Sequence, residues 1–215
     1  MILMVFATEL EAQPFIDHHR LRRMETHQHY IAYEGDGILL IISGMGFLKG
    51  AVALSQAVQR HENSGNAITL VINYGIAGAL TERFSLGEVV CVERAVKYNP
   101  VEFTKTRFNK FFASAFPEIR LTEQAEDAVV LATSDHPILT EDDARLAARY
   151  AHLVDMEGYG YAFVAGVHGI PIQLIKGISD FARKESEDSF RKQVKRTLDA
   201  LLAYHVSGIP CHRTH

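Results

Sequence analysis

Apolar and polar residues along this chain follow two periods, one typical of buried strands and one typical of helices. Residues 2–7 form a continuous apolar run, as expected of a strand that is buried on both faces. Later runs of the strand type lie at residues 30–33, 38–42, 68–73, 86–97, 117–122, 128–132, 153–154 and 170–175. Helical patterns separate several of these runs, and the alternation predicts a single layered α/β domain.

Polar residues mark where several helices should begin. Thr8 can cap a helix that starts at Glu9, and Glu11 has the spacing of a capping box. Thr140 precedes three acids that suit the start of a helix dipole. Residues 190–202 carry apolar side chains at helical spacing, which predicts a final amphipathic helix packed on the sheet.

The segment 153–180 places acids where strands give way to loops. A short apolar strand leads to Asp155 and Glu157, a glycine-interrupted helix follows, and the next strand ends at Asp180. Ligands of open α/β sheets bind at the carboxyl ends of strands, so these acids are candidates for a binding site. The structural alternative is that they cap helices, and we assign that role to Asp155.

Two glycine-rich stretches also follow strands. Gly44 and Gly46 have no side chains, so the backbone N–H groups at this helix start are accessible and can face an anion or a water. This stretch lacks the third glycine of a dinucleotide fingerprint and the lysine of a P-loop. Residues 73–80 are expected to form a tight turn after a strand, in which glycines allow close backbone approach.

Composition is that of an ordinary globular protein. The 215 residues are 47% hydrophobic and 22% charged, which suits one domain over residues 1–206 with a loose tail at 207–215. A net charge of -4 argues against nucleic acid as the main partner. The chain has no apolar run of about twenty residues, so we expect no membrane span.

Cysteine and histidine usage gives no sign of a metal site. Cys91 and Cys211 are far apart and form no Cys-x-x-Cys, so we expect no disulfide framework and no zinc site. A reducing cytoplasm is the expected location.

Glu9 and Glu11 follow the first apolar run too closely for a signal peptide. The eleven histidines show no ligand spacing, and no cofactor is expected.

Three stretches together resemble the nucleoside phosphorylase and nucleosidase superfamily. Its members carry a strand that ends in Met-Glu and a later strand that ends in Ser-Asp, as at 156–157 and 179–180 here. Residues 7–11 resemble the acid-rich turn after the family's first strand, and Asn-x-Gly-x-Ala-Gly at 73–78 resembles its second glycine signature. The resemblance extends to about residue 205, and it implies a three-layer α/β sandwich with a central mixed twisted sheet flanked by helices.

The resemblance also implies catalytic roles for the acids. Glu11 would activate a water, and Asp180 would face N7 of a purine and share a proton with the leaving base. Glu157 would bind the ribose hydroxyls and, when ionised, favour the positive charge that develops on the sugar. Met156 would pack on the sugar.

Further substrate-binding positions follow from the same resemblance: Ser179, Ile76, Gly78, Pro137, Ile138 and Phe103. Ile76 stands where phosphorylases carry a phosphate-binding serine, which favours water as the nucleophile. His136-Pro137 stands where related nucleosidases have a small residue and a stacking phenylalanine. The family closes its pocket around the 5′ substituent with the region 98–116, often from the neighbouring subunit of a dimer; Phe103 and Phe108 are the candidates here.

We therefore expect a cofactor-free, cytoplasmic, homodimeric purine nucleosidase. An aspartate at position 180 favours adenine release from 5′-methylthioadenosine and S-adenosylhomocysteine, a step of methionine salvage. Three alternatives stay open: a futalosine or aminofutalosine hydrolase of menaquinone synthesis, a phosphate-dependent phosphorylase, and a nucleoside-binding protein without catalysis. The opening residues 7–11 and the glycine stretch resemble the futalosine branch at least as well.

Overall fold

A computed structural model describes residues 1–24, 27–98, 116–122, 128–182 and 187–211 of the chain. Its eleven strands form one mixed sheet. The strands are β1 Ile2–Phe6, β2 Arg22–Arg23, β3 Ile31–Gly35, β4 Ile38–Ile42, β5 Leu70–Ala79, β6 Val89–Cys91, β7 Arg94–Lys97, β8 Ile119–Arg120, β9 Val130–Thr133, β10 Leu153–Asp155 and β11 Ile172–Asp180. They run in the order β2-β3-β4-β1-β5-β10-β9-β7-β8, and β11 pairs with both β5 and β6.

Five helices accompany the sheet in the described part of the chain. They are α1 Glu9–His19, α2 Phe47–Asn63, α4 Glu141–Ala147, α5 Gly158–Val167 and α6 Glu187–Ser207. Thr8 caps α1 and Thr140 caps α4, as the sequence predicts. None of the described helices is both long enough and apolar enough to cross a membrane.

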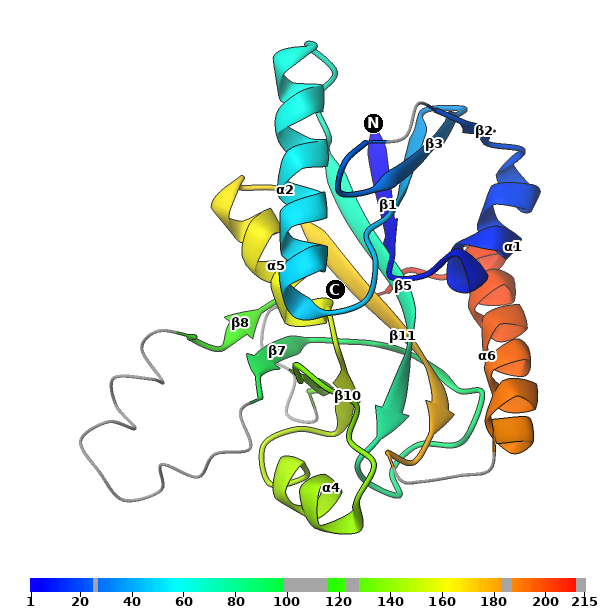
Figure 1. Cartoon of the computed structure of the whole chain (residues 1–215), viewed down its shortest axis with the longest axis vertical. Coiled ribbons are helices and arrows are strands. Elements are labelled where there is room, and N and C mark those ends of the chain that lie inside the picture. The colour runs from blue at the N-terminus through cyan, green and yellow to red at the C-terminus, as the bar shows by residue number, and fades with distance from the viewer. Residues whose placement is uncertain (25–26, 99–115, 123–127, 183–186, 212–215) are drawn as a thin grey trace.

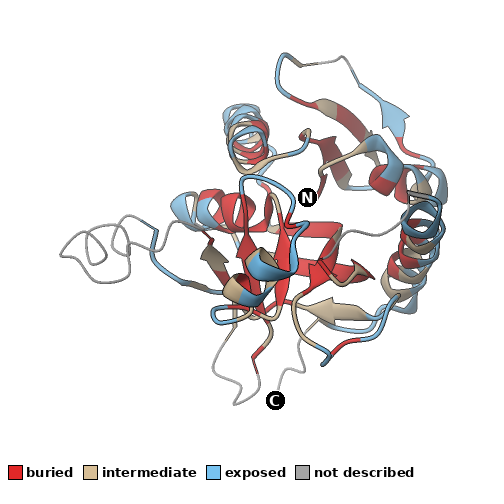
Figure 2. Cartoon of the chain, turned by 60° about the horizontal axis from the view of Figure 1, so that its bottom comes forward, coloured by how far each residue is buried: buried red, intermediate tan, exposed pale blue. Residues whose placement is uncertain are grey.

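The helices cover both faces of the sheet (Figure 1). Successive side chains of a strand point to opposite faces, so Leu3 and Val5 of β1 join a core with α2 and α5. Met4 and Phe6 join a second core, with α1 and α6. Figure 2 shows the buried strands between helices whose outer surfaces are exposed. The predicted three-layer sandwich around a mixed sheet is confirmed.

A gap along one edge of β5 determines where the site lies. β1 runs parallel to β5 and pairs with it as far as Asn73. β10 runs antiparallel to β5 and pairs with it only at Gly78 and Ala79. Because the two strands run in opposite directions, their carboxyl ends approach each other across the stretch 74–77. Backbone groups of β5 in this stretch are thereby available to side chains and ligands.

The prediction of a tight turn at residues 73–80 is wrong, because β5 continues to Ala79. β11 pairs with β5 along this stretch and places Lys176 opposite Gly75 and Asp180 opposite Gly78. A Cβ atom on Gly78 would lie 2.8 Å from Asp180 Oδ1, and one on Gly75 would lie 3.2 Å from Lys176 Nζ. The glycines therefore make room for charged side chains inside the sheet.

The long strand predicted at residues 86–97 is two short strands. β6 pairs antiparallel with β11, whereas β7 pairs parallel with β9. The change of partner occurs between them, since Val92 N–H donates to Leu174 O and Glu93 N–H donates to Val129 O. An apolar run in the sequence indicates that a strand is buried, but it does not indicate which other strand pairs with it.

The two cysteines also differ from expectation. Cys91, at the end of β6, and Cys211, after α6, form a disulfide. Their Cα atoms lie 5.5 Å apart although 120 residues separate them in sequence. Spacing along the chain could not indicate this pair, because the fold alone brings the segment after α6 against β6.

Candidate active site

A cavity of about 1170 Å³ opens at the gap beside β5. Its walls come from the segment after β1, the middle of β5 and the carboxyl ends of β10 and β11. Nine of the ten site residues named from the sequence line it: Glu11, Ile76, Gly78, Pro137, Ile138, Met156, Glu157, Ser179 and Asp180. The tenth, Phe103, lies outside the described residues, as does its alternative Phe108.

Glu11 is held by hydrogen bonds to both of its carboxylate oxygens. Oε2 accepts from the backbone N–H of Thr8 at 3.0 Å and from its hydroxyl at 2.8 Å, which completes the predicted capping box. Oε1 accepts from the backbone N–H of Ile76 at 3.1 Å, across the gap in the sheet. Glu11 therefore caps α1 and also lines the cavity, so the two interpretations of this residue do not exclude each other.

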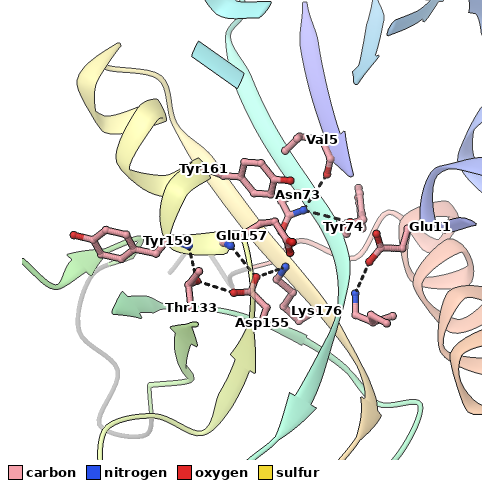
Figure 3. Close-up of polar contacts among 12 residues, drawn as sticks. Val5, Glu11, Asn73, Tyr74, Thr133, Asp155, Glu157, Tyr159, Tyr161 and Lys176 are labelled. Carbon is pink, nitrogen blue, oxygen red and sulfur yellow. Dashed lines mark hydrogen bonds and ion pairs between the residues drawn. The ribbon is translucent and has the colours of Figure 1, made fainter. Parts of the chain in front are cut away.

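Glu157 occupies the cap position of α5, yet its side chain does not cap that helix. It turns towards the start of α2, where its Oε1 accepts from the backbone N–H of Gly46 at 2.6 Å. The accessible backbone N–H that the sequence predicts at residues 44–46 is that of Gly46, and its acceptor is the carboxyl group of Glu157. Figure 3 shows Glu157 and Glu11 coming from opposite sides of β5.

Burial dominates the proton affinity of Glu157. Loss of solvent and the negative charge of Asp155 raise its pKa to about 7. The Gly46 N–H and the cation of Lys176 act in the opposite direction, and the more distant Glu11 raises the pKa slightly further. A carboxyl group in this state exchanges its proton near neutral pH, so hydroxyl donors from a ligand can shift it towards the charged form.

Asp155 forms a buried polar network below Glu157 (Figure 3). Its Oδ2 lies 2.8 Å from Lys176 Nζ and also accepts from the Gly158 N–H at 2.8 Å. Its Oδ1 accepts from the Thr133 hydroxyl at 2.6 Å, and that hydroxyl accepts from the Tyr159 N–H. Through the bond to Gly158, Asp155 accepts from the first N–H of α5, as its predicted capping role requires, although the N-cap position itself is that of Glu157. The network fixes β9, β10, β11 and α5 relative to one another.

Asp180 ends β11 and faces the glycine that β5 places opposite it. Its Oδ2 accepts from the Ser179 hydroxyl at 2.7 Å, and its Oδ1 accepts from the Ala182 N–H at 2.7 Å. A Cβ atom at Gly78 would collide with Asp180 Oδ1, so the glycine permits this placement.

The segment after β9 forms the wall beside Asp180. Pro137 and Ile138 line the cavity there, and Ile138 is buried. An ion pair of 3.0 Å between Asp135 and the largely buried ammonium of Lys97 anchors the segment to β7. An apolar wall held in place beside a carboxyl group suits a flat heterocycle.

Sequence reasoning missed two features of this site. Lys176 directly follows the apolar run predicted at residues 170–175 and received no role, although a lysine inside a buried strand signals a buried partner. The hydroxyl of Tyr161 lies 2.6 Å from the Ser43 hydroxyl under the site, and burial raises the pKa of Tyr161 well above its usual value. No pattern in the sequence distinguishes Tyr161 from the apolar residues of its helix.

The chemistry available at the cavity is that of carboxylates. Three of them, Glu11, Glu157 and Asp180, reach it from separate elements and can accept hydrogen bonds or transfer protons. In the described ranges, no group of three or more His, Cys, Asp or Glu side chains is arranged to hold a metal ion.

Known proteins of similar sequence are nucleosidases by name. A 5′-methylthioadenosine/S-adenosylhomocysteine nucleosidase of Bacillus velezensis is 29% identical over 182 residues, which cover 75% of each chain. The nucleosidase of the same name from Lysinibacillus sphaericus is 30% identical over 178 residues, or 74% of each chain.

Solved structures show the same fold. A futalosine hydrolase mutant of Helicobacter pylori superposes with a TM-score of 0.79 at 17% identity, and 96% of each chain is covered. A 5′-methylthioadenosine/S-adenosylhomocysteine nucleosidase of the same organism, in complex with a substituted pyrrolidin-3-ol, gives a TM-score of 0.80 at 16% identity over 96% of each chain. The family model of the phosphorylase superfamily matches residues 2–206. This chain therefore belongs to the phosphorylase superfamily.

Proposed function

We propose that this protein is a purine nucleosidase, which uses water to release adenine from 5′-methylthioadenosine and S-adenosylhomocysteine. The observation that carries the proposal is the meeting of Glu11, Glu157 and Asp180 on one cavity. The names of the two relatives at 29% and 30% identity support the choice of substrates.

Glu157 binds the ribose. Its Oε1 is held by Gly46, whereas its Oε2 accepts no hydrogen bond from the described residues and is available to the sugar hydroxyls. Because the pKa of Glu157 is raised to about 7, hydroxyl donors that favour the charged form make it ionise as the nucleoside binds. The resulting negative charge stabilises the positive charge that develops on the sugar as the N-glycosidic bond breaks.

Asp180 assists the departure of the purine. A purine leaves poorly as an anion, so a carboxyl group that shares a proton with N7 lowers the barrier. The Ser179 hydroxyl and the Ala182 N–H fix the Asp180 carboxyl, and Pro137 and Ile138 form a wall for the base.

Glu11 activates the water. Its carboxylate lies at the gap between β1 and β10, on the other side of β5 from Glu157. There it can orient a water and accept its proton as the oxygen attacks the sugar. Acid and base assistance each supply roughly 10²- to 10⁴-fold in rate.

Water rather than phosphate is the proposed nucleophile. Ile76, whose N–H binds Glu11, offers no side-chain hydroxyl to a phosphate. Among the described residues that line the cavity, the lysine and arginine side chains are Arg191 and Lys195 on α6. A phosphate dianion beside Glu11 would lack the bidentate arginine that such groups favour.

Futalosine hydrolysis is the second candidate. The cavity of about 1170 Å³ exceeds the roughly 300–1,000 Å³ of common small-molecule pockets, so it has room for a bulky 5′ substituent. The nucleoside-binding protein without catalysis has less support, because carboxylates occupy all three positions.

One assay separates these functions. The purified protein is incubated with 5′-methylthioadenosine, S-adenosylhomocysteine or futalosine, each with and without phosphate, and the free base is quantified by chromatography. We expect adenine release from the first two without phosphate. Release that requires phosphate would identify a phosphorylase, hypoxanthine from futalosine alone would favour the second candidate, and no release from any nucleoside would contradict the proposal.

A homodimer is part of the same proposal. Large apolar side chains are exposed on the neighbouring helices α2 and α5: Leu48 at 72%, Phe163 at 47% and Val167 at 69% of the residue surface. Exposed apolar side chains of this size support association with a second copy of the chain. Light scattering should give twice the chain mass, and Leu48→Glu should shift it to the monomer.

We also propose that the protein is cytoplasmic and that it acts in methionine salvage. We expect neither nucleic acid nor a membrane as a partner. The Cys91–Cys211 disulfide is the observation that weighs against the location, because disulfides are rare in reducing compartments. Thiol labelling of the protein in separated cell fractions would decide it.

A further inference from the structure

Helix α5 contacts the loop 43–46 through two side chains that are one helical turn apart. Glu157, at the start of the helix, accepts from the backbone N–H of Gly46 at 2.6 Å. The hydroxyl of Tyr161 lies 2.6 Å from that of Ser43, at the other end of the loop. Figure 3 shows the side chains of Glu157 and Tyr161 extending from α5 towards β5. The same helix therefore holds both ends of the loop that supplies a donor to Glu157.

Tyr161 is the donor in its contact with Ser43. The Ser43 Oγ lies 3.2 Å from the carbonyl oxygen of Phe6 and 3.0 Å from that of Gly44, and these oxygens can only accept. The single hydroxyl proton of Ser43 is therefore directed to a carbonyl, and its oxygen accepts the proton of Tyr161. Burial raises the pKa of Tyr161 well above its usual value, so the phenol keeps this proton at neutral pH.

Ser43 connects this contact to the ends of two strands. It directly follows β4, and its N–H donates to Phe6 O at 2.9 Å. Phe6 is the last residue of β1, the strand that leads to Glu11. Hydrogen bonds therefore run from α5 through Ser43 to the end of β1, and they join the junctions that carry Glu157 and Glu11.

Glycines make room for the tyrosine ring between α2 and α5. A Cβ atom on Gly50 would lie 2.9 Å from Tyr161 Cε1, and one on Gly160 would lie 3.0 Å from Phe47 O. A phenylalanine at position 161 would fill the same space. Because a buried hydroxyl costs free energy unless it is hydrogen-bonded, packing alone does not account for the polar group of Tyr161.

The loop 43–46 has little of its own to hold it in place. Gly44 and Gly46 adopt positive φ angles of 79° and 104°. Glycine has access to more backbone conformations than any other residue, so its position depends on external contacts. Met45, between the two glycines, is exposed. The contact between Ser43 and α5 therefore decides where the Gly46 N–H lies.

We propose that Tyr161 is a positioning residue for cleavage of the N-glycosidic bond. It fixes the loop 43–46 through Ser43, and the fixed loop keeps the Gly46 N–H on one oxygen of Glu157. The other oxygen is then oriented towards the ribose. The inference rests on the proposed function and adds to it a residue that does not itself line the cavity.

Tyr161→Phe and Tyr159→Phe form a matched pair of variants. Both tyrosines are buried on α5, and both lose one hydrogen bond: Tyr161 the bond to Ser43, and Tyr159 the bond to the carbonyl oxygen of Pro117, at 2.8 Å. Urea unfolding should therefore show similar losses of stability. Only Tyr161→Phe should change the surroundings of Glu157.

The pH profile of kcat/KM for adenine release separates positioning from stability. In Tyr161→Phe, a weaker Gly46 donor should move the transition near pH 7 upward by about 0.5–1 unit, since a hydrogen bond to a charged group corresponds to about one to two units. At a pH below the transition, kcat/KM should therefore fall about three- to tenfold, and it should recover towards pH 9. Tyr159→Phe should leave the transition in place. The other titratable groups that face Glu157 are the same in both variants: Asp155, Lys176 and Glu11.

Ser43→Ala tests the same hydrogen bond from its other end. It should reproduce the shift of the transition, and the double variant with Tyr161→Phe should shift it no further, because both changes remove one interaction. Additive shifts would contradict a path through Ser43. This variant also decides the inference if Tyr161→Phe does not fold.

The outcomes distinguish this inference from the proposed function. An unmoved transition in Tyr161→Phe, with adenine released, would overturn the positioning role and leave the nucleosidase standing. An equal shift in Tyr159→Phe would overturn it as well, by showing a general effect of weakening α5. If no nucleoside releases adenine, the proposed function fails. A carbon-13 NMR titration of the Glu157 carboxyl, assigned with Glu157→Gln, then measures the same shift without turnover.

Discussion

The β1–α1 and β10–α5 junctions each pass from a strand into a helix and each bring a glutamate to the cavity, yet they hold it differently. At β1–α1, three donors face the Glu11 carboxylate, two from Thr8 and one from Ile76. At β10–α5 the cap is Asp155, and Glu157 has one donor, Gly46, with a second carboxylate below it.

The difference shows that two carboxyl groups at the same kind of strand–helix junction can have very different surroundings. Glu11 is fixed by two backbone N–H groups and by the Thr8 hydroxyl. Glu157 is buried above Asp155, which raises its pKa to about 7, so its ionisation depends on what binds. Lys176, paired with Asp155 at 2.8 Å, limits this effect.

The largest expected effect concerns Glu11. Glu11→Gln should lower adenine release roughly 10²- to 10⁴-fold, since the amide cannot accept the proton of the water. Its oxygen can still serve part of the capping box, so the free energy of unfolding should fall by only about 1 kcal/mol. Rates and denaturant titrations measure the two quantities. Glu9→Gln is the control, an exposed acid in the same helical turn; equal losses in both variants would contradict the assigned role.

Lys176→Met should destabilise the β10–α5 junction. It leaves the Asp155 carboxylate buried without its cation, which costs about 3–5 kcal/mol in comparable pairs. Urea unfolding of this variant, of Asp155→Asn and of the double variant measures the coupling. We expect the double variant to be more stable than the sum of the single changes predicts. Strict additivity would mean that the pair does not interact.

Glu157→Gln should remove a pH dependence of the free energy of unfolding. The folded-state pKa of about 7 lies above the ordinary value of 4.5, so the folded protein binds more protons between these pH values and its stability falls as pH rises through that window. At pH 8 the amide should therefore be more stable than the acid, by up to about 3 kcal/mol. Unfolding at pH 4.5 and pH 8 measures this; an unchanged pH dependence in the variant would exclude Glu157 as its source.

The same pKa predicts the pH profile of the wild type. Because kcat/KM reports the free enzyme, it should rise as Glu157 ionises, through a pH of about 7. Rates measured from pH 5 to pH 9 test this. A profile without a transition near pH 7 would mean that the charge of Glu157 does not limit the reaction.

Thr8→Ala should have the smallest effect. It removes the hydroxyl that donates to Glu11 and caps α1, while the backbone N–H of residue 8 still donates. Caps of this kind contribute about 1 kcal/mol. Thermal unfolding should show that loss with a modest decrease in rate. Thr8→Ser, which keeps the hydroxyl, should restore both, and failure of this rescue would exclude the hydrogen bond as the cause.

Strand and helix positions were largely readable from the sequence, with errors where partners decide the structure. The stretch 73–80 resembled a turn because glycines usually end strands, but here they accommodate Lys176 and Asp180 from β11. The run 86–97 was read as one strand because both halves are apolar. The disulfide was missed since only the folded chain brings Cys91 near Cys211.

The order of residues along the chain determined the alternation of strands and helices, the capping of α1 and α4, and the presence of acids at strand ends, because these depend on near neighbours. Tertiary structure alone decided that β1 and β10 meet β5 from opposite directions and leave a gap for Glu11. It also decided the pairing of Lys176 with Asp155 and the raised pKa of Glu157. Charges interact through space and burial depends on the whole fold, so the local sequence determines neither the ion pair nor the pKa shift.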